Sequence, residues 1–120
     1  MATVLIVDDS KTSRSILRDV LTGMKLEVIG EAVNGEEGFL KYKELRPDVV
    51  TMDITMPVMS GLESLLLIKH EDPDAKVVMI TAAGQKENLI QAVKAGASDF
   101  LTKPLEEIEI RRVITDVLAK

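Results

Sequence analysis

Short apolar runs alternate with amphipathic stretches along the whole chain, and this alternation limits the fold more than any other feature. The runs have the length of strands and comprise Thr3–Asp8, Leu26–Ala32, Asp48–Asp53, Lys76–Thr81 and Ser98–Thr102. Between them, apolar residues recur with the period of a helix that lies against a sheet. Strands that alternate with helices form right-handed βαβ units and therefore a parallel sheet. We expect one α/β domain, residues 1–120, with five parallel strands and five helices.

The expected helices carry apolar stripes and terminal signals. The stripes are Ile16, Leu17, Val20 and Leu21, then Leu89, Ile90 and Val93, and finally Ile110, Val113, Ile114, Val117 and Leu118. Asn34 and Ser60 are each followed three residues later by a glutamate, which is the spacing of a capping box. Gly23 and Gly96 stand where helices should end, so we expect both to adopt the left-handed conformation of a C-terminal cap.

The apolar runs also differ in how they alternate with polar residues. Thr3–Asp8, Asp48–Asp53 and Lys76–Thr81 are apolar without alternation, as expected for strands that are covered on both faces. Leu26–Ala32 is interrupted by two glutamates and a glycine, and we therefore expect it at an edge of the sheet.

The composition excludes several classes of function. The chain has a formal net charge of −5 and no run of Lys or Arg, so it lacks the basic patch that nucleic acid or an anionic membrane would bind. It has no cysteine, and therefore no disulfide, thiolate ligand or thiol nucleophile. It has no signal-peptide pattern, and no apolar run approaches the ~20 residues of a membrane span. We expect a cytoplasmic protein that binds neither nucleic acid directly nor membrane.

Carboxylates stand at the ends of two of the apolar runs. Asp53 ends one run, and Asp8 and Asp9 end another. If the two strands are neighbours in a parallel sheet, the three carboxylates meet at its carboxyl edge, where open α/β sheets bind ligands. Like charges so close together must be relieved by a proton or a cation. Because oxygen ligands favour a hard cation, we predict a Mg²⁺ site.

Two further polar residues belong at the same edge, since Thr81 ends one expected strand and Lys103 follows another. An aspartate carboxylate can attack a phosphoryl group and form an aspartyl phosphate. The transfer requires neutralisation of the phosphoryl charge, which Mg²⁺, Lys103 and Thr81 could provide from different sides. Taken singly, these residues could also be a strand threonine and a turn lysine. Together with Asp53, we predict that they form a catalytic group.

Five motifs are specific in combination, although each is weak alone. They are Val7-Asp8-Asp9-Ser10, the stretch from Met52 to Gly61, Thr81-Ala82, Ala95-Gly96-Ala97 and Lys103-Pro104. In this order they make the whole chain resemble the receiver domains of two-component response regulators. The stretch Thr51–Pro57 and the pair Gly84-Gln85 resemble in particular the single-domain chemotaxis regulators of the CheY type. The resemblance implies a doubly wound, flavodoxin-like sheet of strand order 2-1-3-4-5, for which CheY is itself a standard example.

The resemblance implies roles for the residues at the carboxyl edge. Asp53 would accept phosphate from a histidine kinase, and Lys103 would be the cation that contacts it, placed by a cis peptide bond to the following proline. Asp8 and Asp9 would place Mg²⁺, with Asp9 and Asp53 as direct ligands and the backbone carbonyl of Thr55 as a third. Because no output domain follows the last helix, we expect a phosphoacceptor switch that assists its own phosphorylation and dephosphorylation, and not an enzyme with a separate substrate.

The same resemblance implies a route to a target protein. Thr81 and Phe100 would be the switch pair, and the target would bind the outer side of Gln85–Lys94, Phe100 and Glu106–Arg112. The flagellar motor switch is one candidate target. In the unphosphorylated protein we expect Thr81 to point away from Asp53 and Phe100 to be at least partly exposed.

Three positions depart from the usual pattern of the family. Ser60 stands where an acidic or amide residue is more usual, but it should still cap a helix. Phe100 stands where tyrosine is frequent, so the switch must act by steric and apolar contacts. Ala83, two residues past Thr81, has no polar side chain that could orient or block an attacking water.

Three other hypotheses stay open at the level of sequence. A receiver excised from a longer regulator, or an intermediate of a phosphorelay, would carry the same motifs. A flavodoxin-like cofactor carrier could use Ser10–Ser13 as a phosphate loop, although this loop has no glycine and the chain has no Trp and one Tyr for flavin stacking. An aspartyl phosphohydrolase of the haloacid dehalogenase pattern needs a second aspartate two residues past the nucleophile, where this chain has Thr55.

Overall fold

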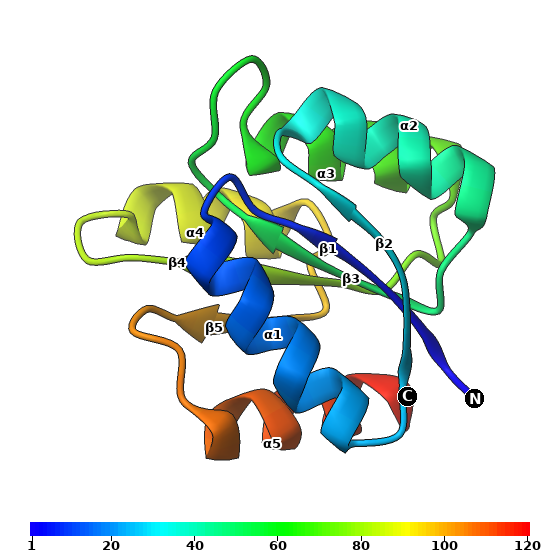
Figure 1. Cartoon of the computed structure of the whole chain (residues 1–120). Helices are drawn as coiled ribbons and strands as arrows, with labels where there is room; N and C mark the ends of the chain where they lie inside the picture. Colours follow the sequence, from blue (N-terminus) through cyan, green and yellow to red (C-terminus); the bar gives the residue numbers. More distant parts are fainter.

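A computed structural model describes residues 1–120 and contains five parallel strands alternating with five helices (Figure 1). The strands are β1 (Thr3–Val7), β2 (Glu27–Ala32), β3 (Val49–Asp53), β4 (Val77–Thr81) and β5 (Asp99–Thr102). The helices are α1 (Lys11–Gly23), α2 (Gly35–Leu45), α3 (Gly61–Glu71), α4 (Lys86–Lys94) and α5 (Glu107–Leu118). The strand order is β2-β1-β3-β4-β5, so the expected doubly wound topology is confirmed. The helices lie on both faces of the sheet, and none has the length and apolarity that a membrane crossing requires.

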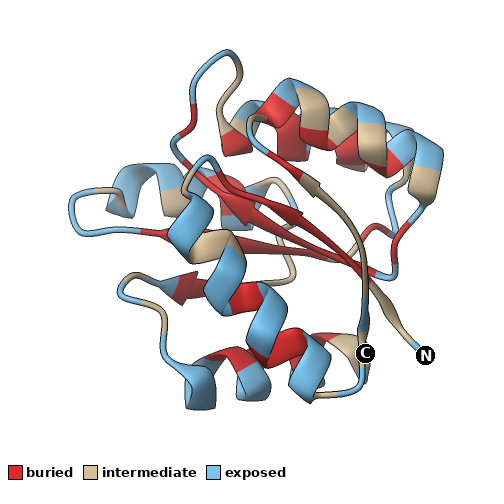
Figure 2. Ribbon diagram, in the orientation of Figure 1, coloured by how far each residue is buried: buried red, intermediate tan, exposed pale blue.

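The sheet separates two apolar clusters, because successive side chains of a strand point to opposite faces. From β1, Val4 and Ile6 pack with the buried residues of α1 and α5. Leu5 and Val7 pack on the other side, in the cluster that is covered by α2, α3 and α4. The three central strands are buried on both faces, as their unbroken apolar runs predicted (Figure 2). β2 forms one edge and is only partly buried, which confirms the expectation for Leu26–Ala32.

The helix ends agree with the sequence signals at three of four positions. The side chain of Asn34 accepts a hydrogen bond from the third residue of α2, and that of Ser60 does the same for α3. Gly96, just past α4, has φ +102 and is left-handed as expected. Gly23 is not, because α1 continues through it and the left-handed residue is Lys25, with φ 66. The amide of Lys25 donates to the carbonyl of Thr22 at 3.0 Å, so the chain closes the helix two residues later than predicted.

Two of the predicted apolar stripes are only partly buried. On α1, Leu17, Val20 and Leu21 are buried against the core, but Ile16 is exposed. On α4, Ile90 and Val93 are exposed, whereas the small Ala92 is completely buried. Thus α4 touches the sheet along a narrower line than its apolar residues suggest, and part of its apolar side faces outward.

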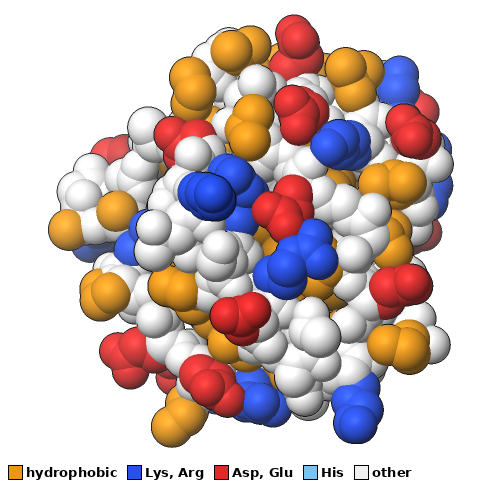
Figure 3. Space-filling view, in the orientation of Figure 1, with side chains coloured by type: hydrophobic (Ala, Val, Ile, Leu, Met, Phe, Trp, Pro, Cys, Tyr) orange, Lys and Arg blue, Asp and Glu red, His pale blue; other side chains and the backbone are white.

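Charges of both signs are interspersed over the face seen in Figure 3. Many of them are paired. Glu31 of β2 accepts from Arg14 at 3.0 Å and from Arg18 at 2.6 Å, both on α1. On α5, Arg112 pairs with Glu109 at 2.8 Å. This face therefore presents no large field of a single sign.

Candidate functional site

The carboxyl edge of the sheet gathers three aspartates. β1 and β3 are hydrogen-bonded neighbours, with Val7 opposite Met52, so the residues that follow Val7 come beside Asp53. Carboxylate oxygens of Asp8, Asp9 and Asp53 lie within 4.8 Å of one another. Asp8 is completely buried and Asp53 is 6% exposed, whereas Asp9 is open to solvent. The structure therefore brings together the three carboxylates that the strand ends predicted.

Lys103 follows β5 and reaches this cluster. Its Nζ donates a hydrogen bond to Oδ2 of Asp53 at 3.2 Å and lies 3.4 Å from Oδ2 of Asp8. The peptide bond between Lys103 and Pro104 is cis, as the resemblance implied. Burial, and then the charge of Asp8, raise the pKa of Asp53 above its ordinary value of 3.8, and Lys103 offsets this only in part. Burial lowers the pKa of Lys103, but the two carboxylates outweigh it and the net change is upward from 10.5.

Asp8 is oriented by residues of α1 and β2. Its Oδ1 accepts from the backbone N–H of Ser10 at 2.8 Å. Its backbone carbonyl accepts from Nη1 of Arg14 at 2.8 Å, and Arg14 is held in turn by Glu31. Its Oδ2 is buried and has no hydrogen-bond partner. Arg14 is a supporting residue that the sequence reasoning missed, and a basic residue one turn into the following helix was the only signal for it.

The backbone around Asp53 packs closely against the start of α3. The N–H of Gly61 donates to the carbonyl of Ile54 at 2.7 Å. A Cβ at Gly61 would lie 1.9 Å from the carbonyl oxygen of Asp53, so only glycine fits there. Ser60 precedes it and caps α3, as expected despite the departure from the family pattern. The contact fixes the turn that follows β3 and with it the direction of the Asp53 side chain.

Thr81 and Phe100 lie on the neighbouring strands β4 and β5. The buried hydroxyl of Thr81 is 3.3 Å from the carbonyl of Ala82 and 3.3 Å from Oε1 of Gln85, and it makes no hydrogen bond to Asp53. Phe100 is 42% exposed. Both positions agree with the expectation for the unphosphorylated protein. Gln85 is a further residue at this edge, which the sequence analysis had assigned only to the expected target-binding face.

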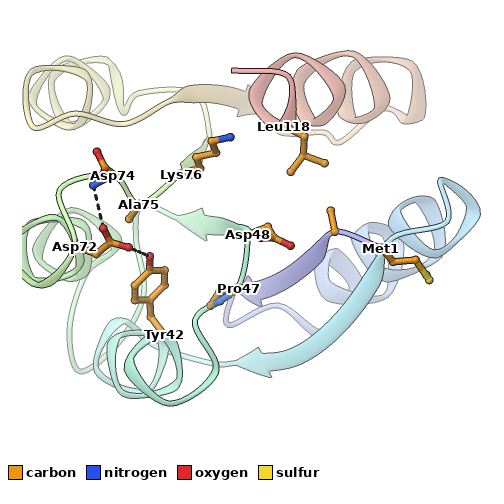
Figure 4. A pocket seen from close by; sticks show the side chains of 10 residues that line it. Met1, Tyr42, Pro47, Asp48, Asp72, Asp74, Ala75, Lys76 and Leu118 are labelled. Carbon is orange, nitrogen blue, oxygen red and sulfur yellow. Dashed lines mark hydrogen bonds between the residues drawn. The ribbon is translucent and has the colours of Figure 1, made fainter.

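The one pocket of the molecule lies at the opposite edge of the sheet, where the strands begin (Figure 4). It has a volume of about 470 Å³, and several of its polar groups are already engaged. The hydroxyl of Tyr42 donates to Asp72 at 2.7 Å, and Nζ of Lys76 donates to the carbonyl of Lys120 at 2.8 Å. Burial and the contact with Asp72 raise the pKa of Tyr42 to about 12. The pocket and the aspartate cluster therefore lie at opposite ends of this sheet.

Comparison with known proteins assigns the family. The sequence pattern of the response regulator receiver domain matches residues 4–115. The chain belongs to this family. The receiver is 47% identical over 114 residues to the chemotaxis protein CheY of Thermotoga maritima, covering 95% of each sequence. It is 44% identical over 115 residues to CheY of Bacillus subtilis, covering 96% of each.

Solved structures support the same assignment of the receiver. A chain in the crystal structure of the CheX-CheY-BeF3-Mg+2 complex from Borrelia burgdorferi superposes with a TM-score of 0.94 at 36% identity, covering 99% of this chain and 90% of that one. The receiver is thus homologous to CheY, a two-component response regulator. Receivers of this type are phosphoacceptor switches that interact with histidine kinases and target proteins, and they are not classical enzymes. Family membership selects the receiver over a cofactor carrier or a phosphohydrolase.

Proposed function

We propose that Asp53 accepts a phosphoryl group from a histidine kinase and that the added charge changes a protein-binding face formed by α4, β5 and α5. The observation that carries this proposal is the grouping of Asp8, Asp9 and Asp53, in which the ammonium of Lys103 pairs with Asp8 and Asp53. Such a grouping costs folding energy and has no packing purpose. In the transfer, an oxygen of the Asp53 carboxylate bonds to phosphorus while the bond from phosphorus to the imidazole nitrogen of the kinase breaks.

The residues at this site fit a magnesium ion. Their side-chain donors are all carboxylate oxygens, and the buried Oδ2 of Asp8 has no hydrogen-bond partner. We propose that Asp9, Asp53 and the backbone carbonyl of Thr55 would hold the ion directly and that Asp8 would help to place it. When bound, Mg²⁺ would neutralise negative charge on the phosphoryl oxygens.

Lys103 and Thr81 would complete the surroundings of the phosphoryl group. The ammonium of Lys103 is already 3.2 Å from the Asp53 carboxylate, so it needs little movement to pair with a phosphoryl oxygen attached there. The hydroxyl of Thr81, at the end of the adjacent strand, can donate a charge-assisted hydrogen bond after a change of rotamer. These two residues act as charge stabilisers, and Asp53 is the nucleophile.

The signal would leave the site through Phe100. Movement of Thr81 toward Asp53 vacates volume beside β5, and the half-exposed ring of Phe100 can rotate into it. The helices of the proposed face also carry exposed apolar residues, which are Ile90 and Val93 on α4 and Ile108 on α5. A target that distinguishes the two positions of the ring would bind the two states with different affinity. Because phenylalanine has no hydroxyl, this coupling is steric.

The biological setting follows from the family. Most of the relatives of similar length are chemotaxis proteins named CheY, so we propose that residues 1–120 act as one receiver domain in chemotaxis, in the cytoplasm, where a histidine kinase can use ATP. The flagellar motor switch is the target to test first. A pull-down with and without beryllofluoride, which imitates the phosphoryl group, should capture a motor component only in its presence. Equal capture in both conditions would contradict a phosphorylation-dependent output.

The transfer itself is tested by labelling with radioactive acetyl phosphate. We expect label on the wild-type protein in the presence of Mg²⁺, no label after chelation, and no label on Asp53→Asn. Thr81→Ala should still be labelled but should lose the phosphorylation-dependent capture of the target. Labelling that persists in Asp53→Asn, or that is independent of metal, would rule out this mechanism.

A further inference from the structure

One side chain, Gln85, connects the two loops that flank Asp53. Its Oε1 accepts from the backbone N–H of Ala82 at 2.6 Å and lies 3.3 Å from the hydroxyl of Thr81. Its Nε2 donates to the hydroxyl of Thr55, which stands in the loop after β3. A single amide group therefore ties the end of β4 to the loop that follows the phosphoacceptor.

The backbone holds Gln85 in this position. Its N–H donates to the carbonyl of Ala82 at 3.3 Å and closes a four-residue turn after β4. Gly84, the third residue of the turn, has φ +86, the value that a type II turn requires at this position. The turn brings the side chain of Gln85 back over the strand end, which is why its amide reaches both Thr81, the last residue of β4, and Ala82, which follows it. It is partly buried, unlike most of α4 that follows.

We propose, on the basis of the function proposed above, that Gln85 is a positioning residue that holds the receiver in its resting state. Its Oε1 accepts hydrogen bonds from the hydroxyl of Thr81 and from the N–H of Ala82, the two donors at the end of β4. While they are so engaged, Thr81 is kept from turning toward Asp53. The hydrogen bond to Thr55 holds the same amide from the loop after β3. We call these contacts of Gln85 with Thr81, Ala82 and Thr55 the latch.

A phosphoryl group can open this latch because it is the stronger acceptor. An ionised oxygen forms hydrogen bonds about twice as strong as a neutral amide oxygen does, so the Thr81 hydroxyl transfers from Gln85 to the phosphoryl group. Part of the free energy gained from the phosphoryl group is spent on breaking the contacts of Gln85, and the strength of these contacts determines how large that part is. A ligand shifts the equilibrium only by its differential affinity for the two states, so a weaker latch means tighter binding of any phosphoryl mimic.

The test is the affinity of the Mg²⁺-saturated protein for beryllofluoride, followed by NMR at the Thr81 methyl group and the Ala82 amide. In Gln85→Ala we expect half-saturation at an approximately tenfold lower beryllofluoride concentration, because the three hydrogen bonds of the Gln85 side chain in the resting state are lost. Without beryllofluoride, both signals should already be displaced toward their bound positions. Glu44→Ala is the control, because Glu44 is an exposed residue of α2, outside the proposed site and the target-binding face, and its replacement should leave the affinity unchanged.

A second variant separates the latch from general damage to the loop. Gln85→Glu keeps an acceptor for Thr81 and Ala82 but cannot donate to Thr55, and it should not bind beryllofluoride more tightly than the wild type. An unchanged or weaker affinity in Gln85→Ala relative to Glu44→Ala would overturn the latch, as would equal tightening in Gln85→Glu. If the wild type itself gives no response to beryllofluoride, the proposed function fails, and the latch fails with it.

Discussion

Replacement of Asp53 by asparagine should make the metal-free protein more stable at neutral pH. The folded chain holds this carboxylate 6% exposed and beside the charge of Asp8. Burial and Asp8 together raise its pKa, which means that the folded state disfavours the ionised form. Asparagine has nearly the same shape and carries no charge. A site built for phosphorylation is thus expected to reduce stability in the absence of its ligands.

The size of the effect follows from three contributions. Carboxylates within 4.8 Å repel by about 3 kcal/mol at an effective dielectric constant of about 20. Lys103, at 3.2 Å, attracts Asp53 by about 5 kcal/mol at the same dielectric constant, but its charge is shared with Asp8 and screened by solvent. These contributions nearly cancel, so desolvation of the carboxylate, several kcal/mol for a buried ion, decides the sign. We expect the free energy of unfolding to rise by about 2 kcal/mol in Asp53→Asn.

The effect must depend on pH in a defined direction. A carboxyl group with a higher pKa in the folded state binds protons more tightly when folded, so stability falls as the pH rises through that pKa. The destabilisation by Asp53 is complete above the raised pKa and absent below the ordinary value of 3.8. The difference between Asp53→Asn and the wild type should therefore shrink as the solution is acidified.

Urea unfolding followed by circular dichroism, with a chelator present, measures this difference at neutral pH and at about pH 4. Asp19→Asn, an exposed aspartate of α1, is the control and should change stability little. Addition of Mg²⁺ at ten times its dissociation constant should raise the stability of the wild type by about 1.4 kcal/mol and that of Asp53→Asn by much less. A neutral or destabilising Asp53→Asn at neutral pH, or a difference that does not change with pH, would refute the reasoning.

Two further predictions concern packing and the far edge of the sheet. Gly61→Ala should lower the free energy of unfolding by more than about 3 kcal/mol, because its Cβ would lie 1.9 Å from the Asp53 carbonyl. Gly23→Ala should instead raise the free energy of unfolding by about 0.5–1 kcal/mol, because its Cβ would meet only an arginine side chain at 3.5 Å. Urea denaturation measures both variants. Similar losses of stability in the two would contradict the packing described for Gly61. Tyr42 is the chain's one tyrosine, so its tyrosinate absorbance should titrate with a pKa of about 12 in the folded protein. Since the ordinary pKa is 10.0, stability should fall as the pH rises from there toward about 12, and a native midpoint near 10 would exclude the buried contact.

The sequence by itself determined the architecture and the position of the acids. The alternation of runs and stripes predicted five parallel strands, the unbroken runs predicted which strands are central, and β2 was expected at an edge. Asp8, Asp9 and Asp53 stand at strand ends, and parallel strands share one carboxyl edge, so their proximity was predictable once the strands were taken as neighbours. The strand order itself came from resemblance to known receivers. These properties follow from local periodicity, which one segment carries without reference to the others.

Only the tertiary structure decided which distant side chains complete the site. Lys103 was expected at this edge from the sequence, but only the fold shows that its ammonium, 50 residues from Asp53 along the chain, donates to that carboxylate at 3.2 Å. The bridge from Gln85 to Thr55, and the single buried residue of α4, likewise have no counterpart in a local pattern. Such contacts depend on the twist of the sheet and on the course of each loop after its strand. The periodicity of a sequence predicts which residues share one face of a helix or strand, but it does not predict which side chains make contact across a loop. The hydrogen bonds that define the resting state could therefore be found only in the fold.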